Sequence, residues 1–91
     1  MKKPAYTITA RFLDNNMPPI TETANERPFA EIAALSIVRR FASVRAVAIK
    51  DEAERTTDIY TPQRIPNSTD GITLKHLFTI PPLPAPLKRA A

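Results

Sequence analysis

The only histidine in the chain, His76, is the first residue to consider for acid–base chemistry. It stands between Leu74 and Phe78 in a stretch where apolar and polar residues alternate, at the apolar parity. An imidazole in that position either makes structural hydrogen bonds at the edge of a core or transfers protons. Because the sequence supplies no cysteine and no second histidine to complete a catalytic set or a metal site, we expect the structural role.

Three carboxylates, Asp51, Glu52 and Glu54, lie close together in the sequence. Such a cluster can hold a hard cation, but between two strands it is more often a solvated turn. A glycine-rich phosphate loop is excluded because the chain contains a single glycine. The sequence therefore predicts no enzymatic activity, no catalytic residues, no metal site and no cofactor.

The absence of cysteine also removes any disulfide framework and any thiol nucleophile. The chain starts with the charges of a signal peptide, but threonine-interrupted sequence follows them instead of an apolar segment. No apolar run approaches the roughly 20 residues that span a bilayer. We therefore expect a soluble, cytoplasmic protein that does not contact the membrane.

Thirteen Lys and Arg residues against nine Asp and Glu give a formal net charge of +4. This charge favours contact with nucleic acid, and it is also an ordinary solubility charge. The candidates for such contact are basic and aromatic residues on the sheet face away from the helix: Arg11, Lys50, Tyr60 and Lys75. A sheet that reads single strands needs two or three stacking aromatic residues, and only Tyr60 is available. A solvated sheet face is the simpler interpretation.

A second basic cluster, Arg39, Arg40 and Arg45, follows the end of the predicted helix. Cations there interact favourably with the C-terminal end of the helix dipole. Together with Ile32 and Leu35 they also have the composition of a protein-contact patch, in which arginine lies beside apolar groups. Both interpretations stay open, and the five residues are candidates for partner binding.

The C-terminal segment is rich in proline, with a Pro81-Pro82-Leu83-Pro84 run that matches the common P-x-x-P spacing. Such a segment favours polyproline II geometry. We expect this basic tail, residues 81–91, to be held in place on its own domain or on a partner. The residues expected to make those contacts are Leu83, Leu87, Lys88 and Arg89.

Hydrophobic periodicity predicts strands over residues 6–12, 44–50, 56–61 and 72–80. A helix capped by Asn25 and running to about Ala42 carries one apolar stripe: Ala30, Ala33, Ala34, Ile37, Val38 and Phe41. The segment from Met17 is expected to be an irregular connector, because it contains two adjacent prolines. Pro62 and Pro66 are expected to bracket a loop.

These elements predict one α+β domain over residues 1–80, in the order β-α-β-β-β. A single helix would pack on a largely antiparallel four-stranded sheet, and the proline-rich tail would follow. The helical crossover either makes the first two strands parallel neighbours or leaves a gap that a later strand fills.

The glycine-poor, cysteine-free arrangement of strand (6–12), helix (30–41) and hairpin (44–59) resembles small host-modulating proteins of phages and prophages, including some anti-CRISPR proteins. The resemblance implies a small inhibitor that binds and occludes a host defence or nucleoprotein complex in the host cytoplasm. The alternatives are a basic nucleic-acid-binding accessory protein that uses the open sheet face, and a building block that forms a homodimer.

Overall fold

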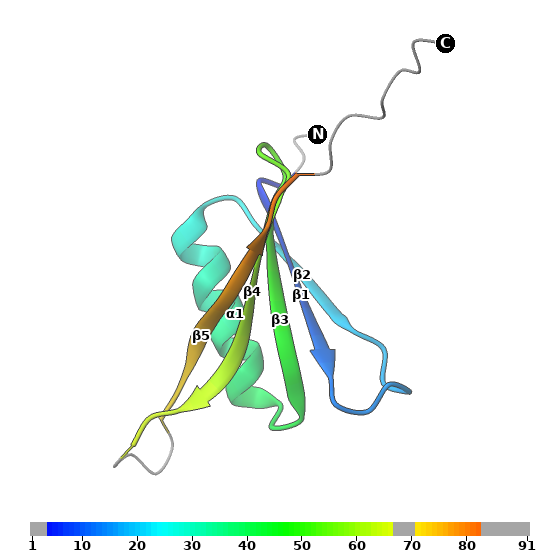
Figure 1. The fold of residues 1–91 in the computed structure, drawn as a ribbon, viewed down its shortest axis with the longest axis vertical. Helices are drawn as coiled ribbons and strands as arrows, with labels where there is room; N and C mark the ends of the chain where they lie inside the picture. The colour runs from blue at the N-terminus through cyan, green and yellow to red at the C-terminus, as the bar shows by residue number, and fades with distance from the viewer. Residues whose placement is uncertain (1–3, 67–70, 83–91) are drawn as a thin grey trace.

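The computed structural model describes residues 4–66 and 71–82, which form one α-helix on one face of a five-stranded antiparallel sheet (Figure 1). The α+β class with a single helix is confirmed, and the expected count of four strands is wrong. No helix in this part of the chain is long and apolar enough to cross a membrane. In chain order the elements are β1 (Tyr6–Phe12), β2 (Ile20–Ala24), α1 (Arg27–Arg40), β3 (Val44–Asp51), β4 (Thr56–Arg64) and β5 (Ile72–Ile80).

The additional strand, β2, lies in the segment that we expected to be an irregular connector. It pairs antiparallel with β1, so that Thr7 is opposite Thr23 and Thr9 is opposite Thr21. The two prolines end just before it, and the β-branched residues that follow them favour an extended backbone. Because β2 is an edge strand, it needs a neighbour on one side only, and five residues suffice.

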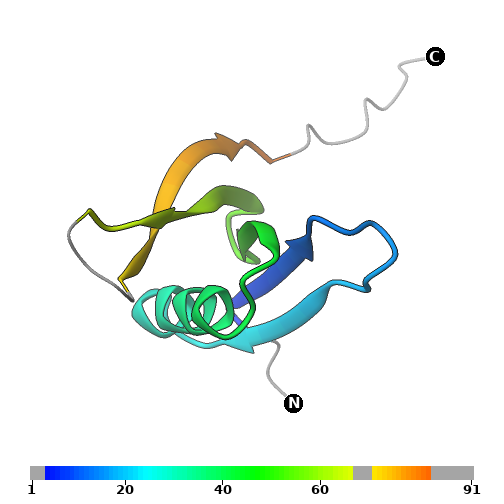
Figure 2. The ribbon, with the colours of Figure 1, turned by 90° about the horizontal axis from the view of Figure 1, so that it is seen from below.

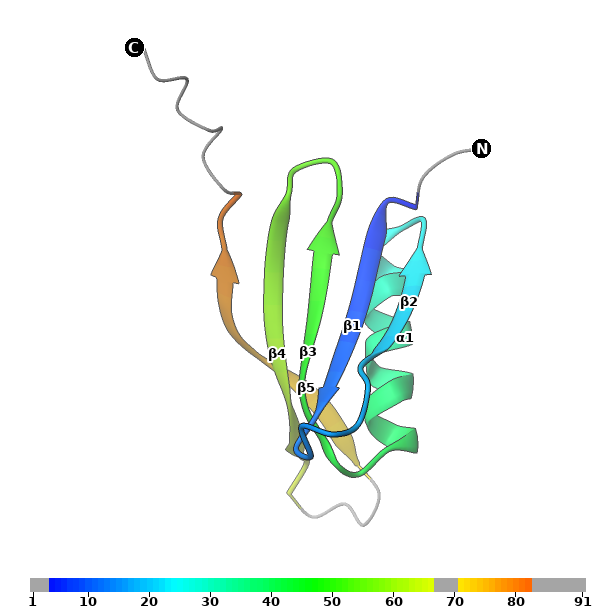
Figure 3. The same cartoon turned by 90° about the vertical axis from the view of Figure 1, so that its right-hand side faces the viewer.

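Strand β1 lies between β2 and β3, which gives the sheet order β2-β1-β3-β4-β5. Because β2 and β3 are both antiparallel to β1, they run parallel to each other, and α1 connects them across β1. Figure 2 shows α1 lying along one face of the sheet, and Figure 3 shows it behind β1 and β2. Both arrangements expected for the first two predicted strands are therefore wrong, because the strands at residues 6–12 and 44–51, β1 and β3, are antiparallel neighbours with no gap between them. The helix follows the additional strand β2 and not β1.

The N-cap of α1 lies one residue later than predicted. Glu26 still has extended dihedral angles, so it is the N-cap in place of Asn25, and no side chain makes a capping hydrogen bond. Pro28 lies in the first turn, where a missing amide hydrogen has no intrahelical partner to lose. The helix ends at Arg40, and the Phe41 amide donates to the Ile37 carbonyl at 3.0 Å.

The core lies between α1 and the sheet face that it covers. The buried residues of α1 come from the predicted stripe, whereas Phe41 at its end is 36% exposed. The Phe12 ring meets the edge of the Phe41 ring, with centroids 5.8 Å apart. Burial of the mostly aliphatic core side chains stabilises this small domain. The buried apolar residues are Ile8, Ala10, Phe12, Ala30, Ala34, Ile37, Val38, Val44, Val47 and Ile49.

Strand β4 is longer than predicted, because it runs through Pro62 to Arg64. The ladder between β3 and β4 ends at the pair Val47 and Tyr60, whereas the ladder between β4 and β5 continues to Arg64. Beyond Tyr60, β4 is therefore an edge strand on its β3 side. Sheets tolerate proline in such a position, since the lost amide hydrogen has no neighbour to bond. The prediction that Pro62 begins a loop is wrong for this reason.

A bulge in β5 changes which of its residues face the helix. His76 is opposite Tyr60 and Phe78 is opposite Ile59, so Leu77 is an extra residue in the ladder. Ile59 and Tyr60 lie on opposite faces of β4, and Phe78 therefore faces away from the helix. The simple alternation predicted for β5 holds only as far as His76, and Phe78 is 52% exposed.

The turn between β3 and β4 contains the clustered carboxylates. The Asp51 carboxylate accepts hydrogen bonds from the amides of Ala53 at 3.0 Å and Glu54 at 3.1 Å. The Arg55 amide donates to the Asp51 carbonyl, and Arg55 has a φ of 61°. The prediction of a turn is confirmed. Among residues 4–66 and 71–82, no group of three or more acidic or histidine side chains is placed to hold a metal ion.

Candidate functional site

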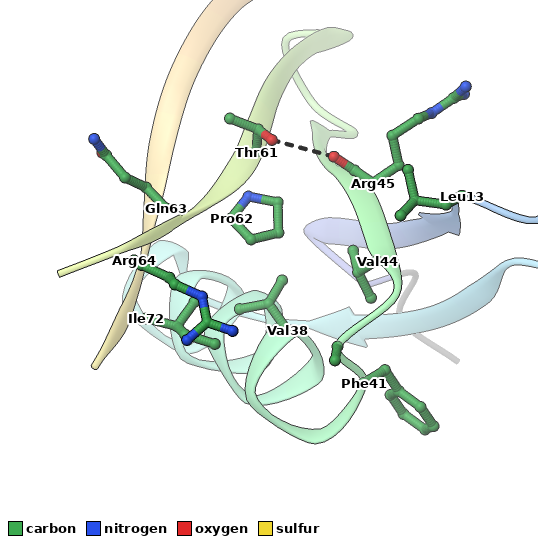
Figure 4. A pocket seen from close by; sticks show the side chains of 11 residues that line it. Leu13, Val38, Phe41, Val44, Arg45, Thr61, Pro62, Gln63, Arg64 and Ile72 are labelled. Atoms are coloured by element: carbon green, nitrogen blue, oxygen red, sulfur yellow. Dashed lines mark hydrogen bonds between the residues drawn. The ribbon is translucent and has the colours of Figure 1, made fainter. Parts of the chain in front are cut away.

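A groove opens where β4 separates from β3. The far end of the β4–β5 hairpin bends toward α1, and Ile72 and Leu74 of β5 pack against the core there. This bend leaves a concavity of about 360 Å³ between the start of β3, the end of β4 and the end of α1 (Figure 4). The Thr61 hydroxyl donates to the Arg45 carbonyl at 3.2 Å and links β4 to β3 beside it.

Apolar side chains line most of this groove, and two arginines stand beside them. Arg45 comes from β3 and Arg64 from β4, and they lie on opposite sides of the groove in Figure 4. Among the described lining residues none is acidic, and neither arginine has an ion-pair partner in residues 4–66 and 71–82. The apolar lining residues are Leu13, Val38, Phe41, Ala42, Val44, Pro62 and Ile72.

The two cations at the groove reflect where charged residues lie in the fold, because the described residues together carry little net charge. The described residues contain nine Lys or Arg and eight Asp or Glu. The other four basic residues and one acidic residue lie outside the described ranges, so three of the four net charges are there. The acids of the β3–β4 turn lie at the other end of the sheet (Figure 1). Among the described residues that line the groove the charged ones are therefore both cations, and Asp14 lines the adjacent hollow that shares Arg45.

The partner-binding candidates of the helix are only partly brought together. Ile32, Leu35, Arg39 and Arg40 surround a shallow hollow of about 320 Å³ on α1, and the Ile32 side chain is 61% exposed. The expected fifth member, Arg45, lines the groove instead. Because α1 ends at Arg40, the next residues turn the chain back into the sheet before Arg45 is reached.

Arg40 is not fully available for a partner. Its guanidinium donates to Glu22 at 3.1 Å and lies 5.6 Å from the centroid of the Phe41 ring. It therefore ties the end of α1 to β2. The tail candidates Leu83, Leu87, Lys88 and Arg89 fall outside the described residues, so the structure does not place them.

The open sheet face carries three of the four residues expected there. The pairs Arg11 with Ala46, Lys50 with Thr57 and Lys75 with Thr61 all face away from the helix. Tyr60 is opposite the buried Val47, so it faces the helix, and the expectation that it joins the open face is wrong.

Phe78 is the aromatic residue that does lie on the open face. It is paired with Ile59, and sequence reasoning missed it because the bulge at Leu77 reverses the parity of the strand. An aromatic side chain for base stacking is therefore present once on this face among the described residues. The other described residues there are Gln63 and threonine, alanine and aliphatic residues around the three cations.

Tyr60 belongs to a polar cluster between the start of α1 and the β4–β5 ladder. Arg27 donates to the Asp58 carboxylate at 2.8 Å and to the Tyr60 hydroxyl at 2.6 Å. It also pairs with Glu31, one helical turn further, at 3.0 Å. The guanidinium lies 5.9 Å from the centroid of the Tyr6 ring. Arg27 therefore connects α1 to β1 and β4, the strands on either side of the central strand β3.

Asp58 also accepts hydrogen bonds from β5. The Thr79 hydroxyl donates to Asp58 Oδ1, and His76 Nε2 lies 3.2 Å from the same oxygen and 3.1 Å from Thr79 Oγ1. Because an ionised carboxylate only accepts and the threonine hydrogen is already used, we assign the imidazole hydrogen to Nε2. Both contacts use Nε2, and among residues 4–66 and 71–82 no side chain hydrogen-bonds to Nδ1. The cluster fastens β5 to β4.

The pKa directions agree with this structural role. The Thr79 hydrogen bond is the largest influence on Asp58 and lowers the pKa of its carboxyl, and Arg27 and His76 act in the same direction against partial burial. Burial raises the pKa of Tyr60. Burial acts to lower the pKa of Arg27, but its hydrogen bonds to Glu31 and Asp58 more than compensate and raise it. At neutral pH Asp58 is thus ionised and Tyr60 is protonated.

Comparison with known proteins found no matching family model, no similar curated protein and no similar solved structure.

The sequence signal that points to the groove is Pro62, because a proline inside a threonine-rich strand pattern marks an edge strand.

Proposed function

We propose that this protein is a non-enzymatic protein-interaction module that binds its partner through the groove between β3 and β4. The observation that carries the proposal is the composition of the groove, an apolar lining flanked by Arg45 and Arg64. Protein interfaces are enriched in arginine and in apolar side chains that fill pockets, and their binding energy concentrates at such positions.

The sequence resemblance supplies the proposed partner class. As an inhibitor of the phage or prophage type, the protein would occlude a host defence or nucleoprotein complex in the cytoplasm. A molecule of 91 residues that covers a surface needs binding contacts and no reacting groups of its own. The polar cluster around Asp58 is consistent with this, since its side chains satisfy one another.

Binding of nucleic acid is the second candidate, and the open sheet face is the surface that favours it. Arg11, Lys50 and Lys75 lie on that face, and their contacts with phosphates would make binding depend on salt. Lys50 Nζ lies 3.8 Å from Glu52, which reduces its availability. With one exposed aromatic residue described there, the face offers little stacking surface. The groove therefore supports protein binding better.

The test is a comparative affinity purification from bacterial lysate with three forms of the protein. Arg45→Glu reverses one charge at the groove, and Lys75→Glu reverses one charge on the open face as a matched control. We expect a stoichiometric protein that wild type and Lys75→Glu retain and Arg45→Glu loses, with the same pattern when that protein is purified and recombined. Recovery of no protein contradicts the proposal. Release of the material by nuclease supports the nucleic-acid alternative.

A further inference from the structure

We infer that the groove binds an acidic peptide segment by taking up one bulky apolar side chain between Arg45 and Arg64, which pair with carboxylates on either side of it. This inference rests on the proposed function and specifies the chemistry of the partner.

The size of the groove fits a side chain and not a folded element. At about 360 Å³ it is at the lower end of the range for ligand pockets. Its lining includes Val38, Val44 and Ile72, which are aliphatic and offer no hydrogen-bonding side chain. The favourable contribution of such a surface is the removal of apolar area from water, so the best occupant is a leucine, methionine or phenylalanine side chain.

The groove walls do not favour binding of a peptide as an added β-strand, although β4 no longer pairs with β3 at this point. Pro62 has no amide hydrogen to donate, and the Arg45 carbonyl already accepts from Thr61 at 3.2 Å. A peptide that completed the sheet would need these groups for its ladder. Recognition therefore depends on side chains, with the peptide backbone crossing the groove mouth.

Charge complementarity selects an acidic peptide. The two arginines are exposed and belong to different strands, so carboxylates that flank an apolar residue can meet both. Arg11 and Asp14 line the adjacent hollow together with Arg45, so the charges that this hollow adds beside Arg45 cancel and do not reverse the sign of the groove. A basic segment, including the Lys88–Arg89 end of this same chain, would meet like charges here. Nucleic acid would meet the charges, but its largest aliphatic substituent on a base is the thymine methyl group, which is too small to fill the apolar lining.

The test uses heteronuclear NMR on the ¹⁵N-labelled full chain, titrated with short blocked peptides. The probe is Asp-Glu-Leu-Phe-Glu-Asp, and the controls are Lys-Lys-Leu-Phe-Lys-Lys and Asp-Glu-Ala-Ala-Glu-Asp. We expect the probe to shift the amide signals of the residues that line the groove, and both controls to bind at least about tenfold more weakly. The double variant Arg45→Gln/Arg64→Gln should weaken probe binding about tenfold, because two partly exposed charge pairs are lost.

Matched variants keep the result interpretable. Lys75→Gln removes a charge from the open face and should leave probe binding unchanged, and an unchanged spectrum outside the substituted positions shows that each variant is folded. Equal binding of the acidic and basic peptides would overturn the inference. So would groove shifts caused by oligodeoxythymidine and not by the probe.

Failure of the inference is distinguishable from failure of the proposed function. If a purified partner binds wild type and loses affinity for Arg45→Glu, while the acidic probe causes no groove shifts, the module function stands and the peptide chemistry assigned here is wrong. If the probe binds the groove as expected and no partner is recovered, the peptide chemistry stands and the interaction-module function is contradicted.

Discussion

Removal of the charge on Asp58 should destabilise the fold far more than removal of any exposed charge. The perturbation is Asp58→Asn, which keeps the size of the side chain and replaces a carboxylate by an amide. Asp58 is 20% exposed and receives hydrogen bonds from Arg27, His76 and Thr79. The asparagine retains one oxygen acceptor, and its amide group, which only donates, would face donor groups that Asp58 now accepts from.

The magnitude follows from the number and type of these contacts. A hydrogen bond to a charged group contributes about 1.5–3 kcal/mol, and partial access to water reduces the loss when its charge is removed. We expect Asp58→Asn to lower the free energy of unfolding by about 2 kcal/mol. In a domain of this size such a loss lowers Tm by roughly 8–16 °C.

The matched control is Glu31→Gln, which removes the other carboxylate paired with Arg27. Glu31 is 55% exposed and one helical turn from its partner, so its loss should cost about 0.5 kcal/mol or less. Urea unfolding at pH 7, followed by circular dichroism, measures both variants. Equal destabilisation by the two substitutions, or a loss below about 0.5 kcal/mol for Asp58→Asn, would refute the role assigned to the cluster.

The pH dependence of this difference gives an independent check. The folded-state pKa of Asp58 is lowered, so the ionised carboxylate stabilises the fold above its unfolded pKa of about 3.9. That contribution is lost as the pH falls through the lower folded pKa. The stability difference between wild type and Asp58→Asn should therefore shrink as the pH falls below about 3.9.

Two further predictions concern packing and the backbone. Ile37→Ala removes a fully buried side chain and should cost about 2–5 kcal/mol in urea unfolding, whereas Ile32→Ala on the outer side of α1 should cost about 0.5 kcal/mol or less; similar losses for both would contradict the assignment of the core face. Arg55 has a φ of 61°, so Arg55→Gly should leave thermal stability unchanged or raise it, and Arg55→Val should lower the free energy of unfolding by about 1 kcal/mol. A stabilising valine in a thermal melt would show that this backbone conformation is not required.

Much of the fold was predictable because it depends on local periodicity. The stripe on α1 specified which helix residues are buried, and the turn at Asp51 followed from clustered polar residues between two strands. Strand β2 was missed because Pro18 and Pro19 suggested a connector, and a short edge strand is defined by its neighbour β1 more than by its own sequence. Its existence depends on a pairing that local patterns do not contain.

The candidate site was predictable only in part. Arg45 was recognised as a binding candidate, but its neighbours across the groove were not, because Arg64 and Ile72 reach it through the bend of the β4–β5 hairpin. Tyr60 was assigned to the wrong face, since its orientation follows from its pairing with Val47. The contact of Arg27 with Asp58 joins residues 31 positions apart and left no signal in either segment.

The sequence by itself determined the class of fold, the apolar stripe of the helix and the absence of cysteine and of a second histidine. These features depend on composition and on spacings of two to four residues. Only the tertiary structure decided where β4 leaves β3 and how the bulge at Leu77 turns β5. Both depend on strand register, which is set by contacts between segments far apart in the chain. That register also produces the groove and the hydrogen bond between His76 and Asp58.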